Sequence, residues 1–254
     1  MNVKPPKLVL DVPVHPLTEP EVVAIVEREV DAGHRVRIGV VNAAKIIAMH
    51  ADRMLWDDVT SSDLVLADGM SVVWASRILG QSLPERVAGI DLMFRLFELA
   101  DRKQLRVFLL GATEEVSAII EANLARDYPS LVLAGRRNGY FSAEESAGVA
   151  EEIAACKPHI LLVAMTTPKK ENFMGRFDAV MGVPVVHGVG GSFDVYSGKV
   201  ERAPVRWQKL GLEWLYRVKQ EPGRLWKRYL ITNVKFSWMV LLALLRRPFV
   251  KSPS

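Results

Sequence analysis

The segment HILLVAMTTPKKENFMGRFDAVM, residues 159–181, decides the fold class. It contains an uninterrupted apolar run, Ile160–Ala164, which is typical of a strand buried on both faces of a parallel sheet. The amphipathic stretch Lys169–Met181 follows a few residues later and predicts a helix. A strand succeeded by a helix is the repeating unit of an α/β fold.

The same unit recurs along most of the chain. Further strands are predicted at 35–41, 63–67, 106–110, 131–134 and 184–187, and further helices at 20–32, 43–53, 70–79, 90–102, 114–126 and 143–155. The pairs Thr18/Glu21 and Ser142/Glu145 have the spacing of a capping box, which supports two of the helix starts. This alternation predicts an α/β fold with a mostly parallel sheet and helices on both faces.

Composition sets the broad class of the protein. The chain has 254 residues, of which 50 % are apolar and 24 % charged, as in ordinary globular proteins. A single cysteine, Cys156, excludes an internal disulfide framework and fits a reducing compartment. Four prolines interrupt the first 17 residues, so no secretory signal is expected. The longest apolar run near either end, 236–245, is too short for a membrane span of ~20 residues, and no transmembrane anchor is expected.

Charge is distributed unevenly along the chain. Residues 200–254 hold twelve Lys or Arg against three Asp or Glu, a net charge of +9, whereas residues 1–199 carry −5. Four of the six tryptophans also lie in the basic part, in three helical stretches predicted at 204–219, 222–234 and 236–246. We therefore expect a catalytic or binding core at 1–202 and a basic, Trp-rich appendage at 203–254 that meets an anionic partner.

Small and polar residues follow nearly every predicted strand. Ligands of an open parallel sheet bind outside the carboxyl ends of its strands, so these residues form a set of site candidates. They are Asn42, Asp68, Gly69, Gly111, Asn138, Gly139, Tyr140 and Gly190. Turns in a purely structural sheet use the same residue types, but the joint pattern favours a ligand of nucleotide size.

Several common sites are excluded or weakened. The turn at 188–193 begins like a dinucleotide fingerprint, but Phe193 stands where the third glycine is needed. No Walker sequence occurs, and the five histidines have no metal-ligand spacing. Since no Asp-x-Asp pair is present to hold a divalent cation, we expect no metal, and a bound diphosphate would need Lys or Arg.

Asp68 is the leading catalytic candidate. It ends an apolar strand, and Gly69 after it lets a ligand approach closely, so its carboxylate could accept a proton from an attacking hydroxyl. The structural alternative is a cap of the helix predicted at 70–79. Arg86 lies in a loop and is either a surface charge or a site residue, and Asp91 is predicted to cap the next helix.

Five segments resemble one family. The motifs Asp68-Gly69-Met70, ERVAGIDL at 85–92, PKKE at 168–171, GVGGSFD at 188–194 and the run from 202 to 224 are similar to those of the WecG/TagA/CpsF bacterial glycosyltransferases. The likeness covers about 36–229, and the C-terminal motif is the most specific part.

The resemblance implies a function. It implies a Rossmann-like core that transfers sugar, with inversion and without metal or other cofactor, from a UDP-sugar to a polyprenyl-diphosphate-linked saccharide. The product would serve exopolysaccharide or cell-wall polymer synthesis, and the protein would be cytoplasmic and peripheral on the inner face of the plasma membrane. An anionic membrane surface and a second copy of the chain are further expected partners.

The resemblance also implies residue roles. Asp68 matches the general base and Arg86 a second catalytic position. Asn42 and Arg86 match donor-pocket positions, and Asp194 falls in the nucleotide-binding turn. Together with the strand-end residues Gly69, Gly111, Asn138, Gly139, Tyr140 and Gly190, and with Lys170, they are the residues that we expect to bind the UDP-sugar. Arg217, Arg224 and Arg228 (or Lys227) match appendage arginines that close over the site and meet the diphosphate. Guanidinium groups can take the role of a metal there.

Two positions depart from the family pattern. Val40 stands where N-acetylmannosamine transferases carry Thr, and Lys170 where they carry Gln. A hydroxyl is lost and a cation gained near the expected donor sugar, which makes a glucose-type or uronic-acid donor an alternative to an N-acetylmannosamine-type donor. A different class is a non-catalytic nucleotide-binding module docked on a membrane or nucleic acid by the basic tail. The tail has no recognised RNA-binding motif, so no nucleic acid is expected.

Overall fold

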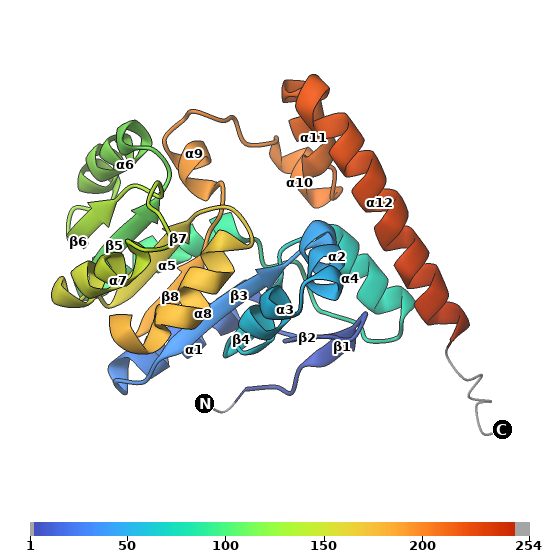
Figure 1. Ribbon diagram of the computed structural model, residues 1–254, viewed down its shortest axis with the longest axis horizontal. Coiled ribbons are helices and arrows are strands. Elements are labelled where there is room, and N and C mark those ends of the chain that lie inside the picture. The colour runs from blue at the N-terminus through green and yellow to red at the C-terminus, as the bar shows by residue number, and fades with distance from the viewer. Residues whose placement is uncertain (1–2, 247–254) are drawn as a thin grey trace.

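The computed structural model describes residues 3–246, apart from the side chains of Lys209 and Arg224, and contains a six-stranded parallel sheet (Figure 1). The strand order is β4-β3-β8-β7-β5-β6. Their bounds are β3 (Val36–Val41), β4 (Leu64–Ala67), β5 (Arg106–Gly111), β6 (Val132–Arg137), β7 (Ile160–Ala164) and β8 (Val185–Gly188). All six predicted strands are therefore confirmed.

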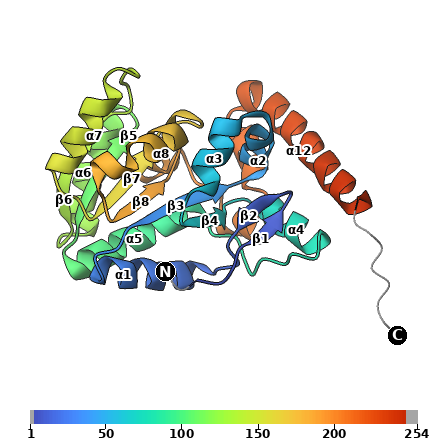
Figure 2. The same ribbon diagram turned by 60° about the horizontal axis from the view of Figure 1, so that its bottom comes forward.

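Helices cover both faces of the sheet (Figure 2). One face is covered by α1 (Glu19–Asp31), α5 (Gly89–Lys103) and α6 (Glu114–Asp127). The other is covered by α2 (Ala43–Ala51), α3 (Arg53–Thr60), α7 (Ser146–Ala155) and α8 (Lys169–Met181). Alternation within β4 shows why: Leu64 and Leu66 belong to the first core, and Val65 and Ala67 to the second. The predicted α/β class is confirmed.

Some local predictions differ from the structure. The helix predicted at 43–53 is divided, because Asp52 adopts an extended conformation and its side chain accepts a hydrogen bond from Leu55 N at 3.1 Å to begin α3. The capping box at Thr18 is confirmed. Ser142 and Glu145 make the expected pair of contacts, yet α7 begins only at Ser146.

Four short elements complete the core. An antiparallel hairpin of β1 (Lys7–Val9) and β2 (Val12–Val14) was not predicted, because three residues are too few to show a periodicity. It packs beside α4 (Met70–Ile78). The last of the four, α9 (Ser192–Tyr196), follows the glycine-rich turn after β8.

The appendage contains three helices, α10 (Val205–Lys209), α11 (Glu213–Gln220) and α12 (Pro222–Leu245). The chain breaks at Glu221, before the proline, as the sequence predicts. The two helices predicted at 222–234 and 236–246 are instead one continuous helix. It lies along α2 (Figure 1), where Phe236 and Val240 join the same apolar core as Ile46.

The face of α12 that points away from α2 is apolar and exposed. Its members are Trp226, Leu230, Ile231, Val234, Trp238, Leu241, Leu244 and Leu245. Within the described chain, 225–245 forms a helix of 21 residues that is long and apolar enough to cross a membrane. The apolar run at 236–245 is thus the C-terminal part of a longer apolar helix. The expectation that no transmembrane anchor is present stays a prediction. Phe236 and Val240 are buried, so one side of this helix packs against the core.

Candidate functional site

The candidate site lies at the topological switch point of the sheet, where the strand order reverses its direction. The chain passes from β3 to the edge strand β4, then crosses over to β5 and β6 at the other edge, which leaves β3 and β8 as neighbours at the switch point. Ligands of open α/β sheets bind at this place, beyond the carboxyl ends of the strands. The residues after β3, β4 and β8 are therefore the centre of the candidate site.

Asn42, Asp68 and Gly69 form one contiguous surface there. Asp68 N donates to Val41 O at 2.9 Å, which joins the ends of β4 and β3. A Cβ on Gly69 would lie 3.2 Å from Cβ of Asn42, so glycine permits this close approach. Asn42 also has a structural role that the sequence did not reveal, because its Oδ1 accepts from Lys45 N at 3.0 Å and caps α2.

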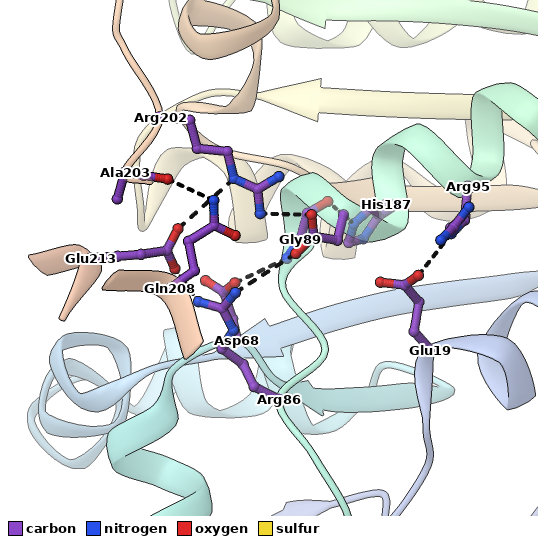
Figure 3. A network of polar contacts seen from close by, with 11 residues as sticks. Glu19, Asp68, Arg86, Gly89, Arg95, His187, Arg202, Ala203, Gln208 and Glu213 are labelled. Atoms are coloured by element: carbon purple, nitrogen blue, oxygen red, sulfur yellow. Dashed lines mark hydrogen bonds and ion pairs between the residues drawn. The ribbon is translucent and has the colours of Figure 1, made fainter. Parts of the chain in front are cut away.

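The Asp68 carboxylate is held by the start of α5. Its Oδ1 accepts a hydrogen bond from Gly89 N at 2.9 Å (Figure 3). Gly89 is the first residue of α5, where the positive end of the helix dipole favours an anion. The cap position of α4 is Gly69, so the interpretation of Asp68 as the cap of that helix is wrong. Asp68 remains partly exposed and can be reached by a ligand.

His187 contacts the same residue, Gly89, through its backbone carbonyl. It is fully buried at the end of β8, and its Nε2 lies 3.2 Å from Gly89 O. Burial lowers the pKa of His187 to about 4, so the ring is neutral near pH 7. The two backbone groups of Gly89 are thus both in contact with side chains: its N–H with the carboxylate of Asp68 and its carbonyl with the imidazole of His187. No sequence pattern indicated this role, since the histidines were considered only as metal ligands.

Arg86 belongs to an ion-pair network that joins the core to the appendage (Figure 3). Its guanidinium donates to Glu213 of α11 and lies 3.7 Å from Asp91 Oδ2. Arg202 Nη2 is 2.6 Å from Asp91 Oδ1, and Arg202 Nε is 3.9 Å from Glu213 Oε1. The side chain of Arg86 is 13 % exposed, so this is not the surface charge that one interpretation allowed.

The network corrects the prediction for Asp91. The cap position of α5 is Ala88, and Asp91 lies inside the first turn, where it pairs with two arginines. Arg202 and Glu213 were missed as site residues, although both belong to the C-terminal motif. A sequence signal existed for Arg202, which begins that motif. Glu213 lies inside the same motif, but its pairing left no local signal because its partner Arg86 is 127 positions away.

A second buried ionic cluster lies on the α8 side of the sheet. Lys45 Nζ and Lys170 Nζ are 2.6 and 3.4 Å from Glu171 Oε1, and each of the three side chains is at most 7 % exposed. Burial and the charge of Lys45 lower the pKa of Lys170 to about 8. Burial alone would raise the pKa of Glu171, but Lys45 and Lys170 together hold it below its usual value. Of these residues the sequence singled out Lys170 alone.

The remaining donor-site candidates lie on the same edge at some distance. Gly111, Asn138, Gly139 and Tyr140 follow β5 and β6, and β5 is four strand positions from β4, or ~19 Å at the usual strand spacing. Gly111 has φ 127°, and a Cβ there would lie 2.3 Å from Ala164 O. Glycine is therefore required at this position by the backbone, whether or not a ligand binds there. Tyr140 is 76 % exposed. The structure therefore brings these residues to the correct edge but not beside Asp68.

The last candidates are divided between α9 and the appendage. Gly190 forms the turn after β8 with φ 54°, and Asp194 lies in α9. Arg217 and Arg228 are exposed on α11 and α12, and the side chain of Arg224 is not described. Among residues 3–246, no group of three His, Cys, Asp or Glu side chains is placed to hold a metal ion.

Comparison with known proteins adds independent findings. The profile of the glycosyl transferase WecG/TagA/CpsF family matches residues 7–249. An N-acetylglucosaminyldiphosphoundecaprenol N-acetyl-beta-D-mannosaminyltransferase of Bacillus spizizenii (strain ATCC 23059 / NRRL B-14472 / W23) is 40 % identical over 172 residues, 68 % of this chain and 66 % of that protein, just under two thirds of its length. The protein of the same description from Bacillus subtilis (strain 168) is 37 % identical over 193 residues, 76 % of this chain and 74 % of its own length. The chain belongs to the WecG/TagA/CpsF family of glycosyl transferases.

Proposed function

We propose that this protein transfers a sugar, with inversion, from a UDP-sugar to a saccharide linked to polyprenyl diphosphate. The relatives are described as transferases that act on N-acetylglucosaminyldiphosphoundecaprenol, which supports a lipid-linked acceptor. The observation that carries the proposal is the position of Asp68: a partly exposed carboxylate at the switch point, held by Gly89 N at the start of α5.

Asp68 would act as the general base. The acceptor hydroxyl gives its proton to the Asp68 carboxylate while its oxygen attacks the anomeric carbon from the face opposite UDP. The bond between that carbon and the UDP oxygen breaks, and UDP leaves with the electron pair. The hydrogen bond from Gly89 leaves the second carboxylate oxygen of Asp68 to face the acceptor.

Arginines would stabilise the departing diphosphate. Arg86 and Arg202 bind the carboxylates of Glu213 and Asp91 beside the first turn of α5, which supports a place suited to negatively charged oxygens. Arg217, Arg224 and Arg228 lie on α11 and α12, the helices that Glu213 attaches to this place. We propose that they meet the diphosphate and supply the charge that a metal supplies in other transferases.

The appendage would also hold the protein at the membrane. The exposed apolar face of α12 is accompanied by exposed Lys227, Arg228 and Lys235. An amphipathic helix of this kind lies in the interfacial plane, and each nearby cation adds ~1 kcal/mol of attraction to anionic lipid. We propose peripheral attachment at the cytoplasmic face, in a pathway of exopolysaccharide or cell-wall polymer synthesis.

The test is release of UDP from a panel of UDP-sugars, with and without a short polyprenyl-diphosphate saccharide. Acceptor-dependent release that the Asp68→Asn variant loses would support the proposal. The alternative, a nucleotide-binding module without catalysis, predicts that UDP-sugars raise the unfolding temperature while no UDP is released. That result would overturn the enzymatic function.

A further inference from the structure

His187 is a buried polar side chain at a position where packing alone needs none. The two residues before it in β8, Val185 and Val186, are apolar and at most 1 % exposed, and the imidazole is fully buried beside them. An imidazole that leaves water loses its hydrogen bonds to water, and this cost is offset only where the protein supplies another hydrogen bond. The contact that His187 makes therefore indicates a role beyond filling space.

The contact determines which ring nitrogen carries the proton. Nε2 lies 3.2 Å from Gly89 O, and a carbonyl oxygen can only accept a hydrogen bond, so Nε2 is the donor. Burial lowers the pKa of His187 to about 4, which leaves the ring with this one proton near pH 7. A neutral donor suits the place, because it adds no positive charge beside Arg86 and Arg202, which pair with Asp91 in the first turn of α5.

Gly89 connects this hydrogen bond to the proposed base. Its N–H donates to Asp68 Oδ1 at 2.9 Å and its carbonyl accepts from His187, so the first residue of α5 is held by the residue that follows β4 and by one from β8 (Figure 3). The packing is close as well, because a Cβ on Gly89 would lie 3.8 Å from His187 Nε2 and 3.9 Å from Gly188 O. The start of α5 thus rests directly on the end of β8.

The strands around the switch point attach this turn at two places. β3 lies between β4 and β8, so Asp68 and His187 reach Gly89 from strands on either side of β3. Val87 N donates to Ala67 O at 2.9 Å, which ties the loop before α5 to the end of β4. The hydrogen bond from His187 supplies the attachment to β8. A turn that lost it could move away from β8, and Gly89 N–H would then move relative to the Asp68 carboxylate.

We propose that His187 is a positioning residue for the general base. By donating to Gly89 O, its imidazole keeps Gly89 N–H directed at one carboxylate oxygen of Asp68 and leaves the other oxygen to the acceptor hydroxyl. This inference rests on the proposed function, since it assumes that Asp68 accepts the proton of the acceptor. Because a misplacement of about 1 Å can lower a rate by ~10²-fold, loss of the hydrogen bond should reduce turnover.

The experiment compares two substitutions at position 187 in the full chain. His187→Gln keeps a donor, because the amide nitrogen of glutamine stands the same number of bonds from the backbone as Nε2, whereas His187→Leu is apolar and has none. The control is His159→Leu, since His159 precedes β7 at the end of the sheet away from Asp68 and its Nδ1 accepts from Arg106 N at 2.9 Å. For each protein, kcat and KM are measured with the UDP-sugar from the panel that supports UDP release, and the unfolding temperature is recorded.

We expect His187→Leu to lower kcat by about 10-fold to 100-fold while the KM for the UDP-sugar stays within about twofold, because Asp68 acts on the acceptor. His187→Gln should recover most of this loss. His159→Leu should keep the wild-type kcat even where its unfolding temperature falls. A wild-type kcat in His187→Leu overturns the inference while leaving the proposed function intact, and so does an equal loss of kcat in the Gln and Leu variants. Turnover of no UDP-sugar by the wild type overturns the proposed function itself.

A measurement on the wild type alone guards against variants that do not fold. With isotope-labelled histidine, the nitrogen chemical shifts of the His187 ring at pH 7 distinguish protonation at Nε2 from protonation at Nδ1. We expect the proton on Nε2, where it can be donated to Gly89 O. A ring protonated at Nδ1 alone contradicts the inference, because Nε2 would then have no hydrogen to donate.

Discussion

Glu213 of the appendage is bound to Arg86 of the core, 127 positions earlier in the chain. The pair lies beside the first turn of α5, whose Gly89 holds Asp68 and whose Asp91 pairs with both Arg86 and Arg202. The first turn of one helix therefore connects the proposed base, the arginines and α11. The ion pairs of Glu213 therefore attach α11 to the core beside the candidate site.

Removing the charge of Glu213 should loosen α11 without unfolding the core. In Glu213→Gln, Arg86 and Arg202 lose an ionic partner, and a partly buried pair of this kind contributes about 1–2 kcal/mol. We expect hydrogen exchange at 213–220 to accelerate by about tenfold. The control is Glu201→Gln, because Glu201 contacts α11 through Tyr216 at 3.3 Å and through its backbone carbonyl, and Gln can retain both contacts. Equal exchange in both variants would show that the ion pairs do not hold the helix.

Asp68→Asn should lower turnover by about 10²-fold to 10⁴-fold, the usual range for loss of a general base. The fold should be retained, because an amide oxygen can still accept the hydrogen bond from Gly89. Asp63→Asn is a matched control: Asp63 precedes β4 at the opposite end of the same strand, where it accepts from Arg37 N at 2.8 Å. UDP release and thermal unfolding are measured for both variants. Near-normal turnover in Asp68→Asn would show that Asp68 is not the general base.

Activity should survive chelation. Since the described residues 3–246 hold no cluster suited to a metal and we assign the charge on the diphosphate to arginines, addition of EDTA should leave UDP release within about twofold of the untreated rate. Loss of activity that magnesium or manganese restores would reveal a metal carried by the substrate or by ligands brought together on binding.

The appendage should separate into two functions. Arg217→Ala and Arg224→Ala should reduce turnover with a short water-soluble acceptor while vesicle binding changes little. Replacing the exposed Trp238, Leu241 and Leu245 with Ser should release the protein from anionic vesicles and spare that turnover. Vesicle co-sedimentation beside the UDP-release assay measures both properties. If both sets of variants lose both properties equally, the appendage acts as one unit.

Lys170 should make stability depend on pH in a defined direction. Its pKa is about 8 in the folded protein and ~10.4 in an unfolded chain, so between these values only the unfolded chain holds the proton. The stability of the wild type relative to Lys170→Gln should therefore rise between pH 7.5 and 10, by about 1–3 kcal/mol. Urea unfolding at several pH values measures this difference. The stability of the wild type relative to Lys103→Gln should show no such rise, because hydrogen bonds to Asp31 raise the pKa of Lys103.

The sequence predicted those parts of the molecule that local patterns determine. The six parallel strands follow from short apolar runs, and the position of Asp68 follows from a strand end followed by glycine. Pairings between distant segments left no local pattern: Lys45 meets Glu171 across 126 positions. Asp91 was misjudged for the same reason, since an acid near a helix start is normally a cap and here distant arginines determine its role.

The length of α12 was also underestimated from sequence. The sequence predicted two helices at 222–234 and 236–246, but these residues form one helix with a side that packs on the core and a side that faces water. Only the contacts of Phe236 with α2 reveal which side that is. Tertiary packing therefore decided both the continuity of the helix and the orientation of its apolar face.

The shared core of α2 and α12 affects how the protein unfolds. Phe236 and Val240 occupy the same apolar cluster as Val41 and Ala43, the residues on either side of Asn42. Detaching the appendage would open that cluster to water next to the site. The chain should consequently melt in a single cooperative transition, and a protein shortened to 1–202 would be a destabilised fragment with an uncovered core, instead of a smaller enzyme that merely lacks its attachment to the membrane.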